Sequence, residues 1–103
     1  MASSPDRIKV SIDSDLEDIT PGYLANRQKD LLNLPEALKN KDFSALQVIG
    51  HRMKGSGAGY GFDAITDIGR LIEMAARDQN EADIQKGIDD LRDYLDRVEV
   101  TYV

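Results

Sequence analysis

Residues 43–61 read FSALQVIGHRMKGSGAGYG, a stretch that combines a helical pattern of apolar residues with the only histidine of the chain. At about 100° per residue, its apolar side chains and two of its glycines fall on one arc of a helix, as expected for a buried face. The residues on this arc are Phe43, Leu46, Ile49, Gly50, Met53, Gly57 and Tyr60. His51 falls about 160° from Met53 on the same helix, so the pattern predicts that its imidazole faces solvent.

The residues next to His51 favour a functional role over an idle surface position. Gly55 follows one turn later on the solvent side, where a glycine costs a helix roughly 1 kcal/mol relative to alanine without any packing gain. Its missing side chain leaves open the position that would otherwise crowd the ring. Lys54 supplies a cation beside it. Because imidazole titrates near neutral pH, we expect His51 to act as a nucleophile or proton carrier on the surface of a partner.

The composition is typical of one globular domain spanning residues 1–103, with 41% hydrophobic and 31% charged residues. The chain has no cysteine, which excludes a disulfide framework and a thiolate metal site. A formal net charge of −6 argues against a nucleic-acid binder. No apolar run is long enough to span a membrane, and the first residues lack a signal-peptide core. We therefore expect a cytoplasmic protein that contacts neither nucleic acid nor membrane.

Two helices are expected in the first part of the chain. The first extends from about residue 20 to residue 39, and Pro35 is expected to kink or split it because proline removes a helical hydrogen bond. The second begins after Asp42, a good N-cap, and continues through the motif to about residue 60.

Two more helices follow, over about residues 62–78 and from Asn80 onwards, where Asn80 can cap the last helix. The last helix is expected to reach Tyr102, because apolar residues recur there at alternating steps of four and three. These residues are Ile84, Ile88, Leu91, Leu95, Val98 and Tyr102. Within residues 5–13, Ile8, Val10 and Ile12 alternate with Lys9 and Ser11, which predicts a short extended N-terminal arm. The sequence thus predicts an all-α fold, an antiparallel up-down four-helix bundle with that arm.

Other kinds of site fit the sequence poorly. Tyr60 stands where the glycine run would need the third glycine of a dinucleotide-binding motif, and no strand precedes it. With a single histidine, a metal site would depend on carboxylates, and these fall on polar helix faces where solvation is their expected role. Neither a nucleotide-binding loop nor a metal site is therefore expected.

The residues around the histidine resemble the signature of histidine phosphotransfer (Hpt) domains. That signature is His-x-x-Lys-Gly-Ser with a later glycine, and it is matched by His51, Lys54, Gly55, Ser56 and, ten residues after the histidine, Gly61. The resemblance is strongest over about residues 42–78. Three small departures, Gly50 in place of the usual alanine and the bulky Tyr60 and Phe62, concern packing rather than chemistry.

The resemblance implies a phosphocarrier in two-component signalling. His51 Nε2 would take a phosphoryl group from a receiver-domain phosphoaspartate or from a sensor histidine kinase, including hybrid kinases, and return it to another receiver. Lys54 would offset phosphate charge, Gly55 would leave docking space, and Glu73 would accept the Nδ1 proton and orient the ring. The domain would bind no cofactor of its own, since the magnesium ion would belong to the receiver, and it would not be a complete enzyme.

The roles of several polar residues stay open at this point. Glu73 could instead pair with Arg70 or Arg77 on its own helix, at positions i−3 and i+4. Arg52, Ala58 and Arg77 are candidates for the surface that docks a partner.

Two other functions compete with the phosphocarrier. A helical adaptor would dock on a partner without carrying phosphate and would place no special demand on His51. An acid–base enzyme using His51 and Glu73 on a small molecule is the weakest of the three, since no deep pocket is expected beside a solvent-facing ring. In each case a single bundle is expected to be a monomer.

Overall fold

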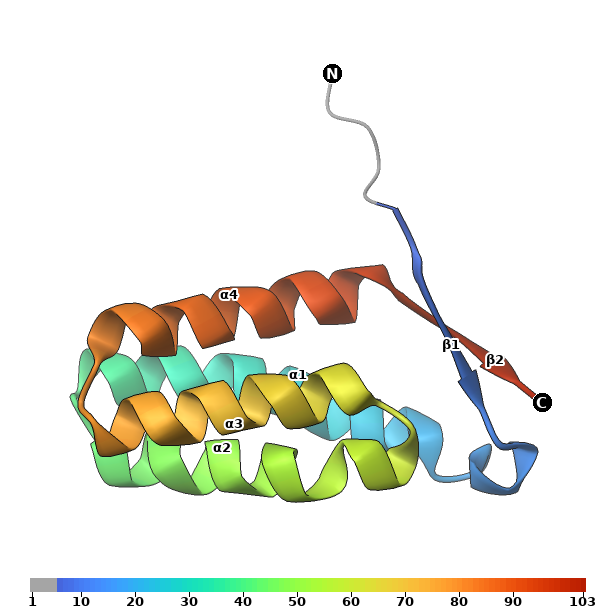
Figure 1. The fold of residues 1–103 in the computed structure, drawn as a ribbon, viewed down its shortest axis with the longest axis horizontal. Coiled ribbons are helices and arrows are strands. Elements are labelled where there is room, and N and C mark those ends of the chain that lie inside the picture. Colours follow the sequence, from blue (N-terminus) through green and yellow to red (C-terminus); the bar gives the residue numbers. More distant parts are fainter. Residues whose placement is uncertain (1–5) are drawn as a thin grey trace.

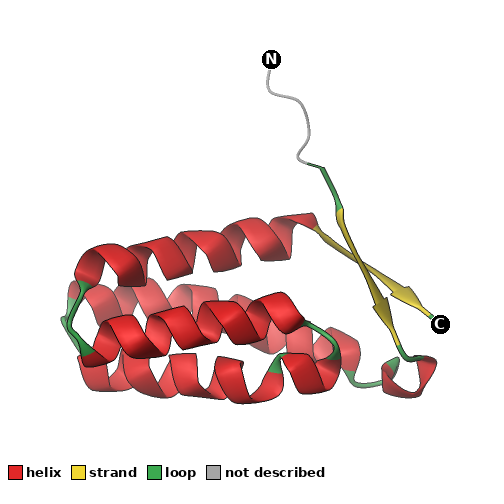
Figure 2. Cartoon of the chain, in the orientation of Figure 1, coloured by secondary structure: helices red, strands yellow, loops and turns green. Residues whose placement is uncertain are grey.

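The computed structural model describes residues 6–103 and consists mainly of four helices (Figures 1 and 2). The helices and strands are β1 (Ile8–Ile12), α1 (Thr20–Lys39), α2 (Phe43–Ser56), α3 (Asp63–Arg77), α4 (Glu81–Arg97) and β2 (Val98–Tyr102). Two short 3-10 helices lie at Ser14–Leu16 and Ala58–Tyr60. Helix α2 packs most extensively on α3, while α4 packs on both α3 and α1. Residue 5, the first of the predicted arm, lies outside the described part of the chain.

The N-termini of α2 and α4 form where the sequence predicts them, because side chains satisfy free backbone groups. Asp42 Oδ1 accepts a hydrogen bond from the backbone N–H of Ala45 at 3.1 Å, which caps α2. Asn80 Oδ1 accepts one from the N–H of Asp83 at 3.1 Å, which caps α4. Both predicted caps are confirmed.

Pro35 was expected to kink or split the first helix, and the expectation of a split is wrong. The helix is continuous from Thr20 to Lys39 although the proline lacks an N–H group. Leu34 and Ala37, on either side of it, are buried in the core, and this packing offsets the missing hydrogen bond.

Helix α2 ends at Ser56, four residues before the predicted end. Thr66 of α3 explains this end, because its Oγ1 accepts a hydrogen bond from the Ala58 N–H at 2.8 Å and donates one to the Lys54 carbonyl at 3.1 Å. The two backbone groups that would continue the helix by bonding to each other are thus satisfied by a side chain. The chain then turns at Gly61, where φ is 92°.

The prediction that α4 reaches Tyr102 is wrong, and so the fold is not purely helical. Helix α4 ends at Arg97, and Val98–Tyr102 forms a strand that pairs in parallel with β1, from Ile8↔Val98 to Ile12↔Tyr102. The segment alternates half-buried and exposed residues and is rich in β-branched and aromatic side chains, which suits a strand. The extended conformation predicted for the arm is present in β1, paired with β2 at one end of the bundle (Figure 1).

The core lies between the four helices and extends under the sheet. Ile12 of β1 is 1% exposed and packs beneath the turn that follows α2: a Cβ added to Gly61 would lie 2.5 Å from Ile12 Cδ1. The sheet therefore covers the end of the bundle where α2 leads into α3.

Candidate functional site

His51 lies on the outer face of α2, and 67% of its side chain is exposed. Leu46 and Met53 of α2 are fully buried and lie on the opposite side of the helix. The prediction that the imidazole faces solvent is confirmed.

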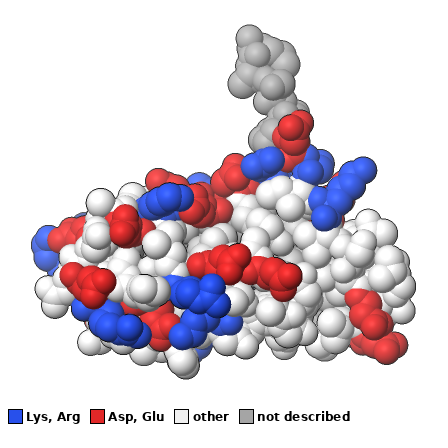
Figure 3. All heavy atoms as spheres, viewed as in Figure 1, with Lys and Arg blue, Asp and Glu red and all other residues white. Residues whose placement is uncertain are grey.

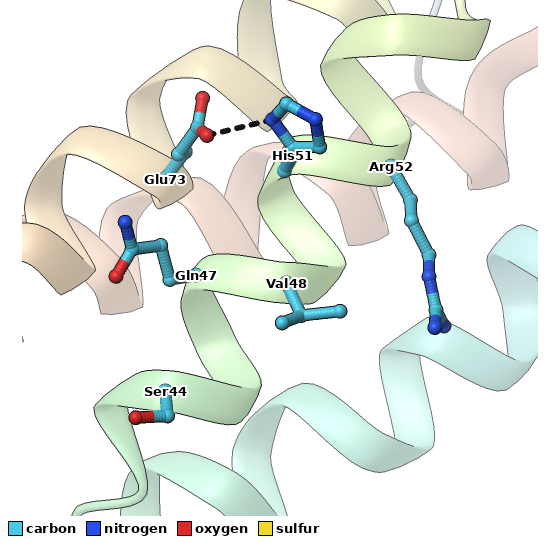
Figure 4. A pocket seen from close by; sticks show the side chains of 6 residues that line it. All are labelled: Ser44, Gln47, Val48, His51, Arg52 and Glu73. Atoms are coloured by element: carbon cyan, nitrogen blue, oxygen red, sulfur yellow. Dashed lines mark hydrogen bonds and ion pairs between the residues drawn. The ribbon is translucent and has the colours of Figure 1, made fainter.

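Glu73 of α3 holds one nitrogen of this ring (Figure 4). Its Oε2 lies 2.8 Å from His51 Nδ1, although Glu73 itself is only 6% exposed. An ionised carboxylate can only accept a hydrogen bond, so Nδ1 carries the proton and donates. Nε2 is then left with a free lone pair, and in Figure 4 it points away from Glu73.

Lys54 reaches the other oxygen of the same carboxylate. Its Nζ lies 2.6 Å from Glu73 Oε1, so that one buried side chain is bound by two residues of α2. The hydrogen bond from Lys54, followed by the one from His51, lowers the pKa of Glu73 below its ordinary 4.5, while burial acts in the opposite direction. Glu73 is therefore ionised at neutral pH, as the donation by Nδ1 requires.

The alternative partners considered for Glu73 on its own helix are not the ones it has in the structure. Arg70 instead forms an ion pair with Asp67, at 3.2 Å. Arg77, one turn beyond Glu73, is exposed. The structure thus brings together His51, Lys54 and Glu73 across the interface of α2 and α3.

The residues expected to dock a partner are spread around this centre. Gly55 has no atom within 4 Å of the position that a Cβ would occupy, so the backbone there is bare. Arg52 extends from α2 toward α1, away from Glu73 (Figure 4). Ala58 is exposed just beyond the end of α2, and Arg77 is exposed on α3.

An open hollow of about 450 Å³ lies beside the ring (Figure 4). It is lined by Ser44, Gln47, Val48, His51, Arg52 and Glu73. Val48 is 48% exposed and gives this surface an apolar side chain. Ser44 and Val48 were not among the predicted site residues, although their positions seven and three residues before His51 place them on its face of the helix.

A second group of polar residues ties the last turn of α2 to α1. Ser56 Oγ donates to the Arg52 carbonyl at 2.8 Å and accepts from Tyr23 Oη at 2.9 Å. Arg27 Nη1 donates to the same Ser56 oxygen at 3.4 Å, and Arg27 Nε lies 2.8 Å from Asp30 Oδ2. Burial raises the pKa of Asp30, and the charge of Arg27 opposes that rise. These contacts hold the residues on the α1 side of the site in place.

Charged side chains of both signs are interspersed on the face shown in Figure 3. No group of three or more His, Cys, Asp and Glu side chains within residues 6–103 is arranged to hold a metal ion. Of the helices in the described part of the chain, none is both long and apolar enough to cross a membrane.

Comparison with known proteins identifies the family. The model of the Hpt domain family matches residues 22–101, a range that includes α2, α3 and α4 and leaves β1 outside. Comparisons with characterised proteins and with solved structures gave no match. Hpt domains are phosphocarrier modules of two-component phosphorelays rather than enzymes. Because the matched range covers well over half of its length, the chain belongs to the Hpt domain family.

Proposed function

We propose that this protein relays a phosphoryl group between His51 and the aspartates of receiver domains. The observation that carries the proposal is the 2.8 Å contact between Glu73 Oε2 and His51 Nδ1. It favours the neutral tautomer in which the exposed Nε2 is the nucleophile.

The transfer step follows from this geometry. The Nε2 lone pair forms a bond to the phosphorus of a phosphoaspartate while the phosphorus–oxygen bond to the aspartate breaks and its carboxylate leaves with the electron pair. Because Nδ1 keeps its proton, the phosphorylated ring carries positive charge, and the Glu73 carboxylate stabilises that charge. Onward transfer to a second receiver reverses these bond changes.

Lys54 supports the reaction from its position on Glu73. Its ammonium keeps the carboxylate ionised and offsets the charge of the phosphoryl group on the neighbouring ring. Gly55 leaves room for the partner, and Arg52, Ala58 and Arg77 take part in docking at the edges of the same surface.

The partners in this proposal are response-regulator receiver domains and a sensor histidine kinase, including hybrid kinases. The receiver supplies the magnesium ion, and this chain supplies no cofactor. The short turns between packed helices support the antiparallel up-down order expected for the bundle. A monomer in the cytoplasm, bound to neither nucleic acid nor membrane, completes the proposal.

Incubation with phosphorylated receiver domains tests it. Label should pass to the wild-type chain in an acid-labile, base-stable form, and His51→Gln should abolish uptake. Gln85→Ala, an exposed change on α4, is the matched control and should take up label normally. Uptake by His51→Gln would refute the proposal. Partner binding that is unaffected by His51→Ala, together with no transfer to any receiver, would instead favour the helical adaptor.

A further inference from the structure

Helices α2 and α3 touch through their backbones beside the site, and two glycines make this contact possible. A Cβ added to Gly50 of α2 would lie 2.6 Å from the Glu73 backbone nitrogen and 2.9 Å from the Gly69 carbonyl oxygen. A Cβ added to Gly69 of α3 would lie 2.7 Å from the Gly50 carbonyl oxygen and would also overlap the Lys54 backbone nitrogen. Backbone atoms cannot swing away as a side chain can, so a side chain at either position must push the helices apart.

This close approach of the two helices involves the residues that carry the site. Gly50 directly precedes His51, and the backbone atoms that its Cβ would meet include that of Glu73. The Cβ of Gly69 would meet the backbone of Lys54. Glycine inside a helix is otherwise unfavourable, which makes the pair notable at this place.

The Glu73 side chain has to span this interface. It is 8% exposed, and its two oxygens reach His51 Nδ1 at 2.8 Å and Lys54 Nζ at 2.6 Å. A side chain of this length can meet both donors only within a narrow range of helix separations, because hydrogen bonds weaken steeply outside a narrow range of distance and angle.

We propose that Gly50 and Gly69 are positioning residues that set the separation of α2 and α3 at which Glu73 binds His51 and Lys54 together. Through Glu73 they fix the tautomer of His51 and keep Nε2 free. The inference rests on the proposed function for its consequence in phosphotransfer, but not for its effect on the tautomer.

Gly57 offers a matched control on the same interface. A Cβ there would lie 2.5 Å from the Thr66 backbone nitrogen and 2.8 Å from the Phe62 carbonyl oxygen, which is as tight as at Gly50. None of the atoms it would meet belongs to His51, Lys54 or Glu73. It would also lie 2.7 Å from Thr66 Oγ1, which donates to the Lys54 carbonyl. Gly57→Ala therefore tests loosening of the interface at a place where the side chains of His51, Lys54 and Glu73 are not met.

The test is a measurement of the ¹⁵N chemical shifts of the His51 ring, which report the nitrogen that carries the proton. Gly50→Ala and Gly69→Ala should move these shifts toward the values of Glu73→Gln, while Gly57→Ala should keep wild-type values. Phosphotransfer should slow by about ten- to a hundredfold in the first two variants, as expected for a misplaced reacting group. Adding Gly50→Ala to Glu73→Gln should cause no further loss, since the glycine acts through the glutamate.

Two results would overturn the inference: wild-type ¹⁵N shifts of the His51 ring in Gly50→Ala, or shift changes in Gly57→Ala as large as those in Gly50→Ala. If the alanine variants do not fold, Glu73→Asp tests the inference without any change at the glycines. The aspartate side chain is one methylene shorter, so the hydrogen bond to His51 Nδ1 should be lost. Retention of the wild-type tautomer in Glu73→Asp would show that the helix separation is not limiting and would overturn the inference. Because the ring shifts need no phosphate, a wild-type chain that takes up no label would contradict the proposed function alone.

Discussion

Lys54 Nζ lies 2.6 Å from Glu73 Oε1, across the interface of α2 and α3 and beside the ring of His51. The lysine of the signature is therefore bound to the residue that orients the histidine. In the proposed function it acts on the ring through Glu73 as well as through its own charge. The pairing joins residues 19 positions apart, which no pattern within one helix could have revealed.

Replacing Lys54 should weaken the orientation of His51. Lys54→Met keeps most of the aliphatic stem but removes the strongest cause of the lowered pKa of Glu73, so that pKa should rise toward 4.5. The lost charged hydrogen bond should slow phosphotransfer by about tenfold. A carboxyl-carbon NMR titration measures the pKa, and a time course of label uptake measures the rate. Lys86→Met, which breaks an ion pair with Asp90 on α4, should change neither.

The lowered pKa of Glu73 predicts a pH dependence of stability. A carboxyl group whose pKa is lower in the folded chain than in the unfolded one stabilises the fold above the unfolded value and loses this effect as the pH falls through the folded value. The difference in unfolding free energy between wild type and Glu73→Gln should therefore shrink as the pH falls below about 4.5. Urea unfolding at a series of pH values measures it. A difference that grows as the pH falls below 4.5 would contradict the assigned ion pairing.

Ile12→Ala should destabilise the whole bundle. Ile12 is 1% exposed, and truncation of a buried isoleucine costs about 2–5 kcal/mol. Ser11→Ala, at the neighbouring exposed position of β1, should stay within about 0.5 kcal/mol of wild type. Urea unfolding compares the two. Equal stability of both variants would mean that β1 is not part of the folded core.

Gly61→Ala should also destabilise the chain, because φ at this position is 92° and a Cβ would meet Ile12. The left-handed conformation alone costs a residue other than glycine about 1–2 kcal/mol. In the Ile12→Ala background the overlap is removed, so the cost of Gly61→Ala should be smaller there. A double-mutant cycle on unfolding free energies measures this coupling. Strict additivity would contradict the contact.

The features that were predictable from the sequence depend on residues close together in the chain. The caps at Asp42 and Asn80 act over three residues, and the exposure of His51 follows from the apolar pattern of its own helix. The bundle was likewise evident from four apolar faces and short connections. A cap or an apolar helix face is formed by residues that are close in the sequence, so a local pattern is enough to predict it.

The features that were missed depend on distant partners. Residues 98–102 fit a helical step and a strand alternation equally well, and the choice depends on β1, about 90 residues earlier. Helix α2 stops at Ser56 because Thr66 bonds to the backbone beyond it. The contacts of Tyr23 and Arg27 with Ser56 join α1 to α2 in the same nonlocal way.

The most direct measurement is ³¹P NMR of the phosphorylated chain, because it distinguishes phosphate on Nε2 of a histidine from phosphate on Nδ1. We predict one phosphohistidine signal, from the Nε2 isomer at His51, that disappears in His51→Gln. A signal from the Nδ1 isomer, or phosphate on any other residue, would contradict the claim that Glu73 occupies Nδ1 and leaves Nε2 as the nucleophile.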